Sequence, residues 1–314
     1  MIGKSRLRRG LLSDASKHLE AAIARLTFRH PNPVTGEAHY FLGLTQRYLG
    51  NLEAAYSLYY KATWNYEWRS SAYYQIATLD CLKGDFSSAL RHLDQSLATN
   101  RDHNKARVLT ALVLRQTGEE TAAVRMLDEL LASDPLDHWA IHARGDIEKF
   151  LAATRNDAQT ILDLVFDYVE AGFEEQALAL IELHHGQPAS DCAVPNPLMN
   201  SQMTGYEKAW LSGEMADLDS ARGQSPDHFF PSRLHEQLIL EWAIAQPGDD
   251  LLAAYALGNY YYDLKRHEEA RDMWKQASAT GNPQAHRNLG IALWNISRDG
   301  ERARAAYLNA IAAD

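Results

Sequence analysis

The sequence predicts an all-α fold, an α-solenoid of stacked antiparallel helix pairs with irregular repeats in its middle. The prediction rests on one period of 34 residues, which is typical of two-helix repeats. At this interval a glycine recurs, an alanine follows it by five residues, and a large apolar residue follows by four more. The glycines are Gly50, Gly84 and Gly118, the alanines are Ala55, Ala89 and Ala123, and the large residues are Tyr59, Leu93 and Leu127.

This order of residues has a physical cause. Two antiparallel helices approach most closely where a small side chain faces the partner, and large side chains one turn away fill the space beside the contact. A glycine reaches positive φ at little cost, so it ends the first helix of each pair. The pattern therefore predicts a first helix, a glycine turn and a second helix in every unit.

Three units keep the register without a break, at 36–69, 70–103 and 104–137. Pro135 lacks the N–H that a continuing helix needs, so the second helix of the third unit is expected to end there. Together with the degenerate stretch that follows, these units form the predicted N-terminal part of the solenoid, 1–185.

The stretch 138–185 is expected to be degenerate. Residues 138–151 read as a first helix with Gly145 at its small position, and no full second helix is evident before Arg155. Residues 158–185 resume the helical pattern.

A polar stretch with two prolines, 186–196, is predicted to be a linker or loop. The second part of the solenoid, 197–314, is expected to end in two regular repeats, at about 251–282 and 283–314. Two further helices are expected before them, at 197–212 and 232–246, on either side of a stretch rich in glycine and proline around Gly223 to Pro231.

Both ends look like interrupted repeats. Near the N-terminus, the order of small and large residues matches a turn and second helix whose first helix would begin before Met1. At the other end, no polar capping helix follows the last repeat, although solenoids normally need one. We therefore expect the chain to be a portion of a longer protein. The N-terminal residues concerned are Gly10, Ala15, Leu19 and Ala22.

Composition narrows the classes of function. The formal net charge is −10, which disfavours nucleic acid and anionic membranes as partners. Cys81 and Cys192 are the only cysteines and do not form a CxxC pair, so a disulfide framework and a structural zinc site are not expected. No apolar run has the length of a signal peptide or a transmembrane helix. We expect a reduced, cytoplasmic protein.

The in-phase units resemble the tetratricopeptide repeat. Leu42-Gly43 and Ile76-Ala77 match the large–small pair of its first helix, and Pro135 matches its closing proline. The resemblance implies a right-handed superhelix whose first helices line a concave surface that binds proteins or peptides.

A finer resemblance runs along nearly the whole chain. The matching stretches look like the C-terminal tetratricopeptide region of large bacterial proteins whose N-terminal domain is β-rich and similar to galactose mutarotase. That resemblance implies an accessory region in a carbohydrate-utilisation setting, and it transfers no catalytic residues. The stretches include Lys61 to Asn65, Ser96 to Asn100, Asp134 to Trp139 and Phe229 to Pro231.

Motifs for chemistry are weak. Gly3-Lys4-Ser5 lacks the upstream glycine and strand of a phosphate-binding loop. His138 and His142 lie four residues apart, but Trp139 replaces the glutamate of the H-E-x-x-H zinc motif. Adjacent glutamates recur just after helix turns, where their charge favours a helix N-terminus. They are Glu119-Glu120, Glu174-Glu175 and Glu268-Glu269.

The candidate site is the face formed by the first helices. Tyr, Trp and Arg at interfaces bury large areas with few rotamers to freeze, so these residue types mark the expected contact positions. The known clamp for a chaperone's C-terminal carboxylate is absent, because the matching positions hold no Lys, Asn or Arg. The candidates are Tyr40, Arg47, Tyr48, Tyr74, Lys105, Arg115, Trp139, His142, Tyr255, Asn259, Tyr262, Arg287 and Trp294.

These observations predict a non-catalytic scaffold, without cofactor or metal, that binds a peptide, another protein or its own neighbouring domain on the concave face. Two alternatives stay open. The chain could be an accessory module of a carbohydrate-active enzyme whose catalytic domain lies elsewhere, or the aromatic groove could bind sugar directly.

Overall fold

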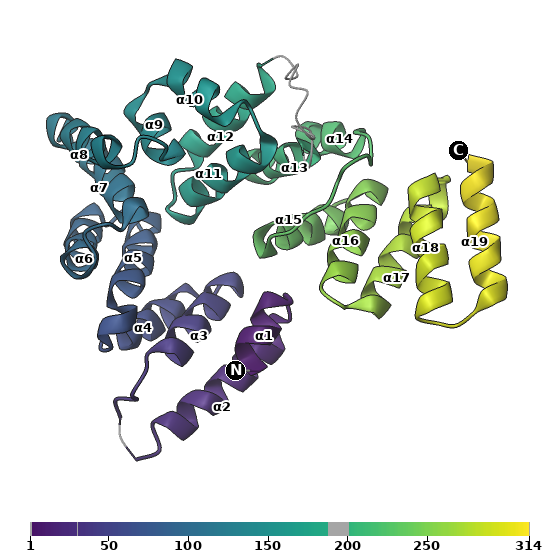
Figure 1. Ribbon diagram of the computed structural model, residues 1–314, viewed down its shortest axis with the longest axis horizontal. Helices are drawn as coiled ribbons and strands as arrows, with labels where there is room; N and C mark the ends of the chain where they lie inside the picture. Colours follow the sequence, from purple (N-terminus) through teal and green to yellow (C-terminus); the bar gives the residue numbers. More distant parts are fainter. Residues whose placement is uncertain (1, 30, 188–200, 314) are drawn as a thin grey trace. The chain divides into compact units, whose positions relative to one another are not determined.

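The computed structural model describes residues 2–29, 31–187 and 201–313, and all regular structure within these ranges is helical (Figure 1). The predicted all-α solenoid of helix pairs is confirmed. The helices are α1 (Ile2–Arg8), α2 (Leu12–Leu26), α3 (Glu37–Tyr48), α4 (Leu52–Ala62), α5 (Tyr66–Leu82), α6 (Phe86–Thr99), α7 (Asn104–Gln116), α8 (Glu120–Ser133), α9 (His138–Arg144), α10 (Ile147–Thr154), α11 (Ala158–Glu170), α12 (Glu174–His185), α13 (Ser201–Ser212), α14 (Met215–Arg222), α15 (Leu234–Ala245), α16 (Leu251–Asp263), α17 (His267–Ala277), the 3-10 helix η1 (Ser278–Thr280), α18 (Pro283–Asn295) and α19 (Gly300–Ala313).

The helices form two compact units. Unit 1 contains the residues up to Arg155 together with Phe166–Ala177. Unit 2 contains Asn156–Val165 together with the residues from Leu178 onward. Helices α11 and α12 therefore each contribute residues to both units. The predicted linker at 186–196 falls mostly outside the described residues, so the boundary placed there stays a prediction.

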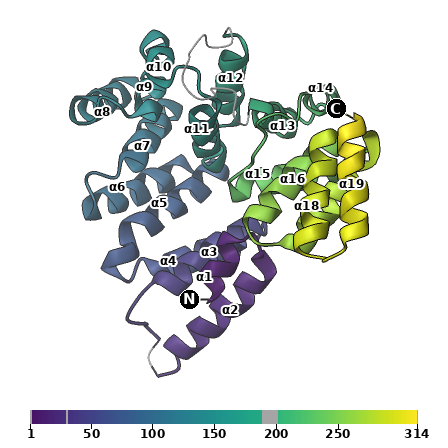
Figure 2. The same cartoon turned by 45° about the vertical axis from the view of Figure 1, so that its right-hand side comes forward.

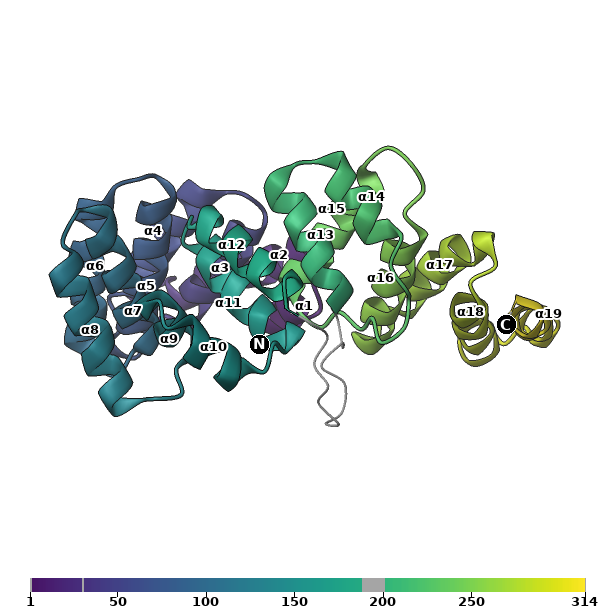
Figure 3. The ribbon, with the colours of Figure 1, turned by 90° about the horizontal axis from the view of Figure 1, so that it is seen from above.

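Unit 1 is built from hairpins whose close contacts use small residues. The pairs α3/α4, α5/α6 and α7/α8 stack in chain order, as Figures 1 and 3 show. Ala55, Ala89 and Ala123 are completely buried between the paired helices. A Cβ atom at Gly43 would lie 2.8 Å from the Tyr59 ring, so only glycine permits this helix approach. The turn glycines of these hairpins all have positive φ.

The fourth hairpin corrects the sequence-based reading of 138–151 as one helix. Gly145 has φ +89° and ends α9, and α10 begins two residues later. Asp137 and Asp146 each accept a hydrogen bond from a backbone N–H in the first turn of the helix that follows. These two caps and the glycine between them divide the segment into a short hairpin, because each helix has its own start signal.

Unit 2 ends in the hairpins α16/α17 and α18/α19 (Figure 2). A Cβ atom at Gly258 would lie 2.3 Å from the Trp274 ring, and one at Gly290 would lie 2.9 Å from Tyr307. The turns of these hairpins use Lys265 (φ +61°) and Arg298 (φ +54°) in place of glycine. The two regular repeats predicted here thus keep the small-residue contact between their helices without a glycine in the turn.

The middle of unit 2 is irregular. Helices α13, α14 and α15 precede the regular hairpins, and α14 occupies part of the stretch in which the sequence showed no helix. Ser225–Pro231 follows α14 as a connection without helix or strand, and it turns at Asp227 and His228. In the part of the chain that the structure describes, no helix has both the length and the hydropathy needed to cross a bilayer.

Candidate partner-binding site

The first helices of unit 1 bring eight of the predicted site residues onto one side. We call this side the first-helix face of unit 1. It is covered by the chain's own residues 166–173, which are the last turn of α11 and the turn that leads to α12. Its residues are Tyr40, Arg47 and Tyr48 on α3, Tyr74 on α5, Lys105 and Arg115 on α7, and Trp139 and His142 on α9.

Arg47 binds the end of α11. Its guanidinium donates one hydrogen bond to the main-chain carbonyl of Glu170, and donates two others to Gln75 Oε1 at 2.8 Å and Thr78 Oγ1 at 2.7 Å. The last carbonyls of a helix have no partner within the helix and carry partial negative charge, which favours a cation there. Arg47 therefore serves as a C-terminal cap supplied from another repeat.

Lys105 contacts the last turn of α11, and the charges of that turn act on Tyr74. The Lys105 ammonium lies 2.6 Å from a carboxylate oxygen of Asp167. Tyr74 is buried, and its ring lies 5.0 Å from that of His103. Burial, with the nearby charges of Asp167 and Glu170 adding to it, raises the pKa of Tyr74 well above its usual value. The Tyr74 side chain is thus part of the packing and offers no surface to a partner.

Trp139 and His142 hold Tyr168, the next residue of α11. The Trp139 ring meets the Tyr168 ring edge-on at 5.6 Å, and His142 Nδ1 is hydrogen bonded to the Tyr168 hydroxyl at 2.7 Å. Trp139 and Tyr168 are both almost completely buried. The expectation that Trp139 anchors a partner is therefore corrected, because the partner of its ring is this chain's own tyrosine.

Tyr40 and Tyr48 are partly buried beside the end of α11. The Tyr40 ring packs 4.9 Å from Trp68 and 5.6 Å from Tyr59. Burial and then the charge of Glu170 raise the pKa of Tyr40, and that of Tyr48, to about 12. Both hydroxyls therefore stay protonated at neutral pH.

His142 predicts a dependence of stability on pH. Burial lowers the pKa of His142 from 6.5 to about 4. Between these two pH values the ring is therefore mostly neutral in the folded chain and mostly protonated in the unfolded chain. The contribution of the neutral His142 ring to the free energy of unfolding is fully present above pH 6.5. It is lost progressively as the pH falls toward 4. We expect His142→Gln to reduce the loss of unfolding free energy between pH 7 and pH 4.5 by about 1–2 kcal/mol. Urea titrations at both pH values measure this; equal losses in the two proteins would contradict it.

Part of the first-helix face of unit 1 stays open next to this packing. Two adjoining cavities of about 230 and 340 Å³ share Gln116, Phe173 and Gln176. Arg115 and His142 line the smaller one. Arg115 donates a hydrogen bond to the carbonyl of Ala143 and contacts Glu120 at 3.1 Å, so its guanidinium is held at the rim.

Unit 2 shows a second case in which first-helix residues hold the chain's own backbone. Asn259 on α16 donates a hydrogen bond to the carbonyl of Phe229, and Gln202 on α13 donates to the carbonyls of Ser225 and Asp227. Phe229 is buried and stacks on Tyr206 at 5.9 Å. Side-chain amides thus hold the connection 225–231 through its main chain.

The remaining predicted residues of unit 2 do not form one surface. Tyr255 is buried, and Tyr262 packs against Trp274 at 5.3 Å. Asn259 Oδ1 also accepts hydrogen bonds from Trp274 and Asn288, so both the oxygen and the nitrogen of its amide have partners within the chain. Arg287 and Trp294 are exposed on α18. Tyr255 is therefore corrected from a contact residue to a core residue, and Asn259 to a residue that holds 225–231.

Comparison with known proteins agrees with this architecture. The family model of the tetratricopeptide repeat matches residues 1–67, 83–138 and 255–314, together more than half of the chain. The chain belongs to the tetratricopeptide repeat family. Repeats of this family generally bind proteins or peptides and are typically non-catalytic.

Several solved tetratricopeptide structures are similar at low identity. A tetratricopeptide repeat protein from Parabacteroides merdae is 16% identical over 93% of this chain and 96% of its own, with a TM-score of 0.40. The C-terminal part of a Cytophaga hutchinsonii repeat protein is 12% identical over 100% and 94%, with a TM-score of 0.34. YrrB, described as having an unusual peptide-binding site, is 14% identical over 71% and 92%, with a TM-score of 0.25.

The residues considered for chemistry have structural roles in this tetratricopeptide protein. The adjacent glutamates lie in or next to the first turns of α8, α12 and α17. His184 and His185 are hydrogen bonded to Asn156 and Thr204. Cys81 is buried, and burial raises its pKa to about 12, so it is not a reactive thiolate. Among the described residues, no three His, Cys, Asp or Glu side chains are grouped to hold a metal ion.

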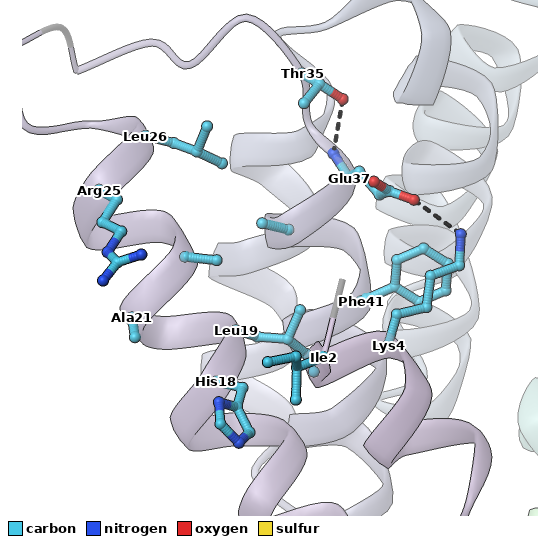
Figure 4. Close-up of a pocket in the computed structure, with 13 residues that line it drawn as sticks. Ile2, Lys4, His18, Leu19, Ala21, Arg25, Leu26, Thr35, Glu37 and Phe41 are labelled. Atoms are coloured by element: carbon cyan, nitrogen blue, oxygen red, sulfur yellow. Dashed lines mark hydrogen bonds and ion pairs between the residues drawn. The ribbon is translucent and has the colours of Figure 1, made fainter.

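A further cavity, not expected from the sequence, lies near the N-terminus. It has a volume of about 610 Å³ and lies on the first hairpin and the start of the next first helix, lined by residues of α1, α2 and α3 (Figure 4). The sequence signal was present in the apolar positions of α2, but those positions were assigned to packing within the repeat.

Proposed function

We propose that this chain is a non-catalytic scaffold that binds a polypeptide partner on the first-helix face of unit 1. The proposal is supported by side chains that donate hydrogen bonds to the main chain of other segments of the same chain. Arg47 in unit 1, and Gln202 and Asn259 in unit 2, donate hydrogen bonds to main-chain carbonyls of segments that lie on the first helices. Side chains that satisfy backbone carbonyls are suited to bind other polypeptides in the same way.

The open part of this face is the proposed contact area. Gln116 and Gln176 carry amides with both donors and acceptors, and Phe173, which also lines both cavities, is itself buried. Arg47 and Lys105 have a different task, which is to hold residues 166–173. The side chains of Tyr40, Tyr48 and Tyr74 are partly or fully buried in unit 1. The partner would thus bind beside α11, where the amides remain accessible.

Direct sugar binding receives no support from four of the predicted aromatic residues, whereas Trp294 on α18 is exposed. Tyr74, Trp139 and Tyr255 are buried, and Tyr40 packs against other rings. A sugar needs an open aromatic face on which to stack, and these rings are covered. The alternative of an accessory module remains compatible with the proposal, since the partner would then be a neighbouring domain of a longer polypeptide.

Site-specific photo-crosslinking tests the proposed function. A benzophenone amino acid is placed at Gln116 or Gln176, and, as a control, at Arg125 on the exposed side of α8. We expect irradiation of the protein in its native cells to give one dominant protein adduct from the two glutamine positions and not from Arg125. A synthetic peptide covering the crosslinked segment should then bind the purified chain.

Two results would count against the proposal. Adducts of equal yield and identity at Arg125 would show unspecific contact, and an absence of adducts at both glutamines would place any partner elsewhere. An intramolecular adduct in a longer version of the protein would identify the partner as a neighbouring domain.

A further inference from the structure

The larger of the two cavities beside α11 is lined by carboxylates. We call it the α12 cavity, and its volume is about 340 Å³. Glu174 and Glu175, in the first turn of α12, line it and are both exposed. Phe86 at the start of α6 and Gln116 at the end of α7 also line it. The cavity thus combines two acidic groups with an amide and an aromatic ring.

The turn between α11 and α12 fixes the position of these groups. Gly172 has φ +76°, and a Cβ atom there would lie 3.1 Å from the Leu82 side chain at the end of α5. The N–H of Phe173 donates a hydrogen bond to the carbonyl of Tyr168 at 2.9 Å, and Phe173 is buried. Because this turn packs so closely on α5, the cavity is formed before a partner binds.

Two further exposed carboxylates lie at the turns next to the α12 cavity. Asp85 directly precedes Phe86, and Glu119 follows Gln116 by three residues. Within the described part of the chain, none of these four carboxylates forms an ion pair, although lysine and arginine at the same turns do. The N-terminus of a helix carries about half a positive charge, which offsets only part of the two charges on α12. The surroundings of the cavity are therefore negative.

The cations at these turns are already paired. Lys83 lies 2.6 Å from a carboxylate oxygen of Glu53, and Arg115 lies 3.1 Å from one of Glu120. His142 lines the adjoining cavity, and burial lowers its pKa to about 4, so its ring is neutral at pH 7. These side chains therefore do not cancel the charge of the four carboxylates.

We propose that the α12 cavity binds a lysine or arginine side chain of the partner, so that the partner's bound segment is basic. The aliphatic part of this side chain packs on Phe86, and its charged end donates hydrogen bonds to Glu174 and Glu175. The amides of Gln116 and Gln176 bind the main chain of the same segment. The inference rests on the proposed function and adds the chemistry of the partner at that site.

Fluorescence anisotropy with defined peptides tests the proposal on the full chain. The probe is a labelled nine-residue peptide in which three lysines alternate with serine and leucine. The control peptide has the same sequence with acetyl-lysine in place of lysine, which keeps the aliphatic stem and removes the charge. We expect saturable binding of the lysine peptide, weakened by NaCl, and at least tenfold weaker binding of the acetylated peptide.

Two double variants and one matched control locate the binding. Glu174→Gln with Glu175→Gln should weaken binding of the lysine peptide about fivefold or more, since it removes the charges that line the cavity. Glu129→Gln with Glu148→Gln removes two charges at other exposed positions of unit 1, and binding should stay within about twofold.

The second double variant, Gln116→Ala with Gln176→Ala, removes the two amides and leaves the net charge unchanged. We expect it to weaken binding of the lysine peptide about threefold or more, because the main chain of the peptide loses its partners. Unchanged binding would show that the peptide is attracted by charge alone and would contradict the proposal.

Three further results would overturn the inference. They are no saturable binding of the lysine peptide, equal binding of the acetylated peptide, and equal effects of the two glutamate double variants. The crosslinking experiment separates this failure from that of the proposed function. An adduct at Gln116 with a partner segment that has no lysine or arginine would refute only the basic partner, whereas the absence of adducts would contradict the proposed function itself.

Discussion

Ala89→Trp will lower the free energy of unfolding of unit 1 by about 3 kcal/mol. Ala89 is completely buried where α6 packs in the second regular hairpin, together with Leu93. An indole ring cannot fit there without moving one helix away from the other, because cores are packed at crystal-like density. Urea denaturation followed by far-ultraviolet circular dichroism measures the loss.

The matched control for this variant is Asp94→Trp, which places the same ring at an exposed position of the same helix. We expect a change within about 0.5 kcal/mol, as for most surface substitutions. If Ala89→Trp unfolds at the same urea concentration as Asp94→Trp, the repeat register assigned to this hairpin is incorrect.

Arg47→Ala will destabilise unit 1 by about 2–3 kcal/mol, although Arg47 is a polar residue of the predicted binding surface. Its guanidinium satisfies the Glu170 carbonyl, Gln75 and Thr78. Gln75 and Thr78 are buried, and the removal of a charged donor leaves their acceptors and the end of α11 without it. The same denaturation experiment measures the loss.

Arg101→Ala is the control for Arg47→Ala, since it removes an exposed arginine from the same unit. It should change the free energy of unfolding by less than about 0.5 kcal/mol. An Arg47→Ala protein as stable as Arg101→Ala would mean that Arg47 faces solvent and is available to a partner, as the sequence alone suggested.

The regular hairpins could be predicted from sequence because their signals are local. Each unit repeats a glycine turn and an alanine contact, and Ala55, Ala89 and Ala123 have the burial that the pattern requires. The division of 138–154 into two helices was missed because Gly145 fits both a close helix contact and a turn. Its φ of +89° shows that Gly145 forms the turn that ends α9.

Whether the first-helix faces are open or covered could not be predicted from the sequence, because this depends on contacts between residues far apart in the chain. Arg47 and Glu170 are 123 residues apart, and Asn259 and Phe229 are 30 apart. A one-dimensional repeat pattern shows which residues share a face, but it does not show what covers that face. Arginine, tyrosine and tryptophan are suited both to bind a partner and to hold a segment of the same chain.

Hydrogen–deuterium exchange of residues 166–173 tests most directly the claim that unit 1 holds its own α11 on the first-helix face. We predict slow exchange of the amides of this segment in the wild-type chain and in Arg101→Ala, and much faster exchange in Arg47→Ala, with little change in α6 and α8. Fast exchange in the wild-type chain, or equal exchange in all three proteins, would contradict the account.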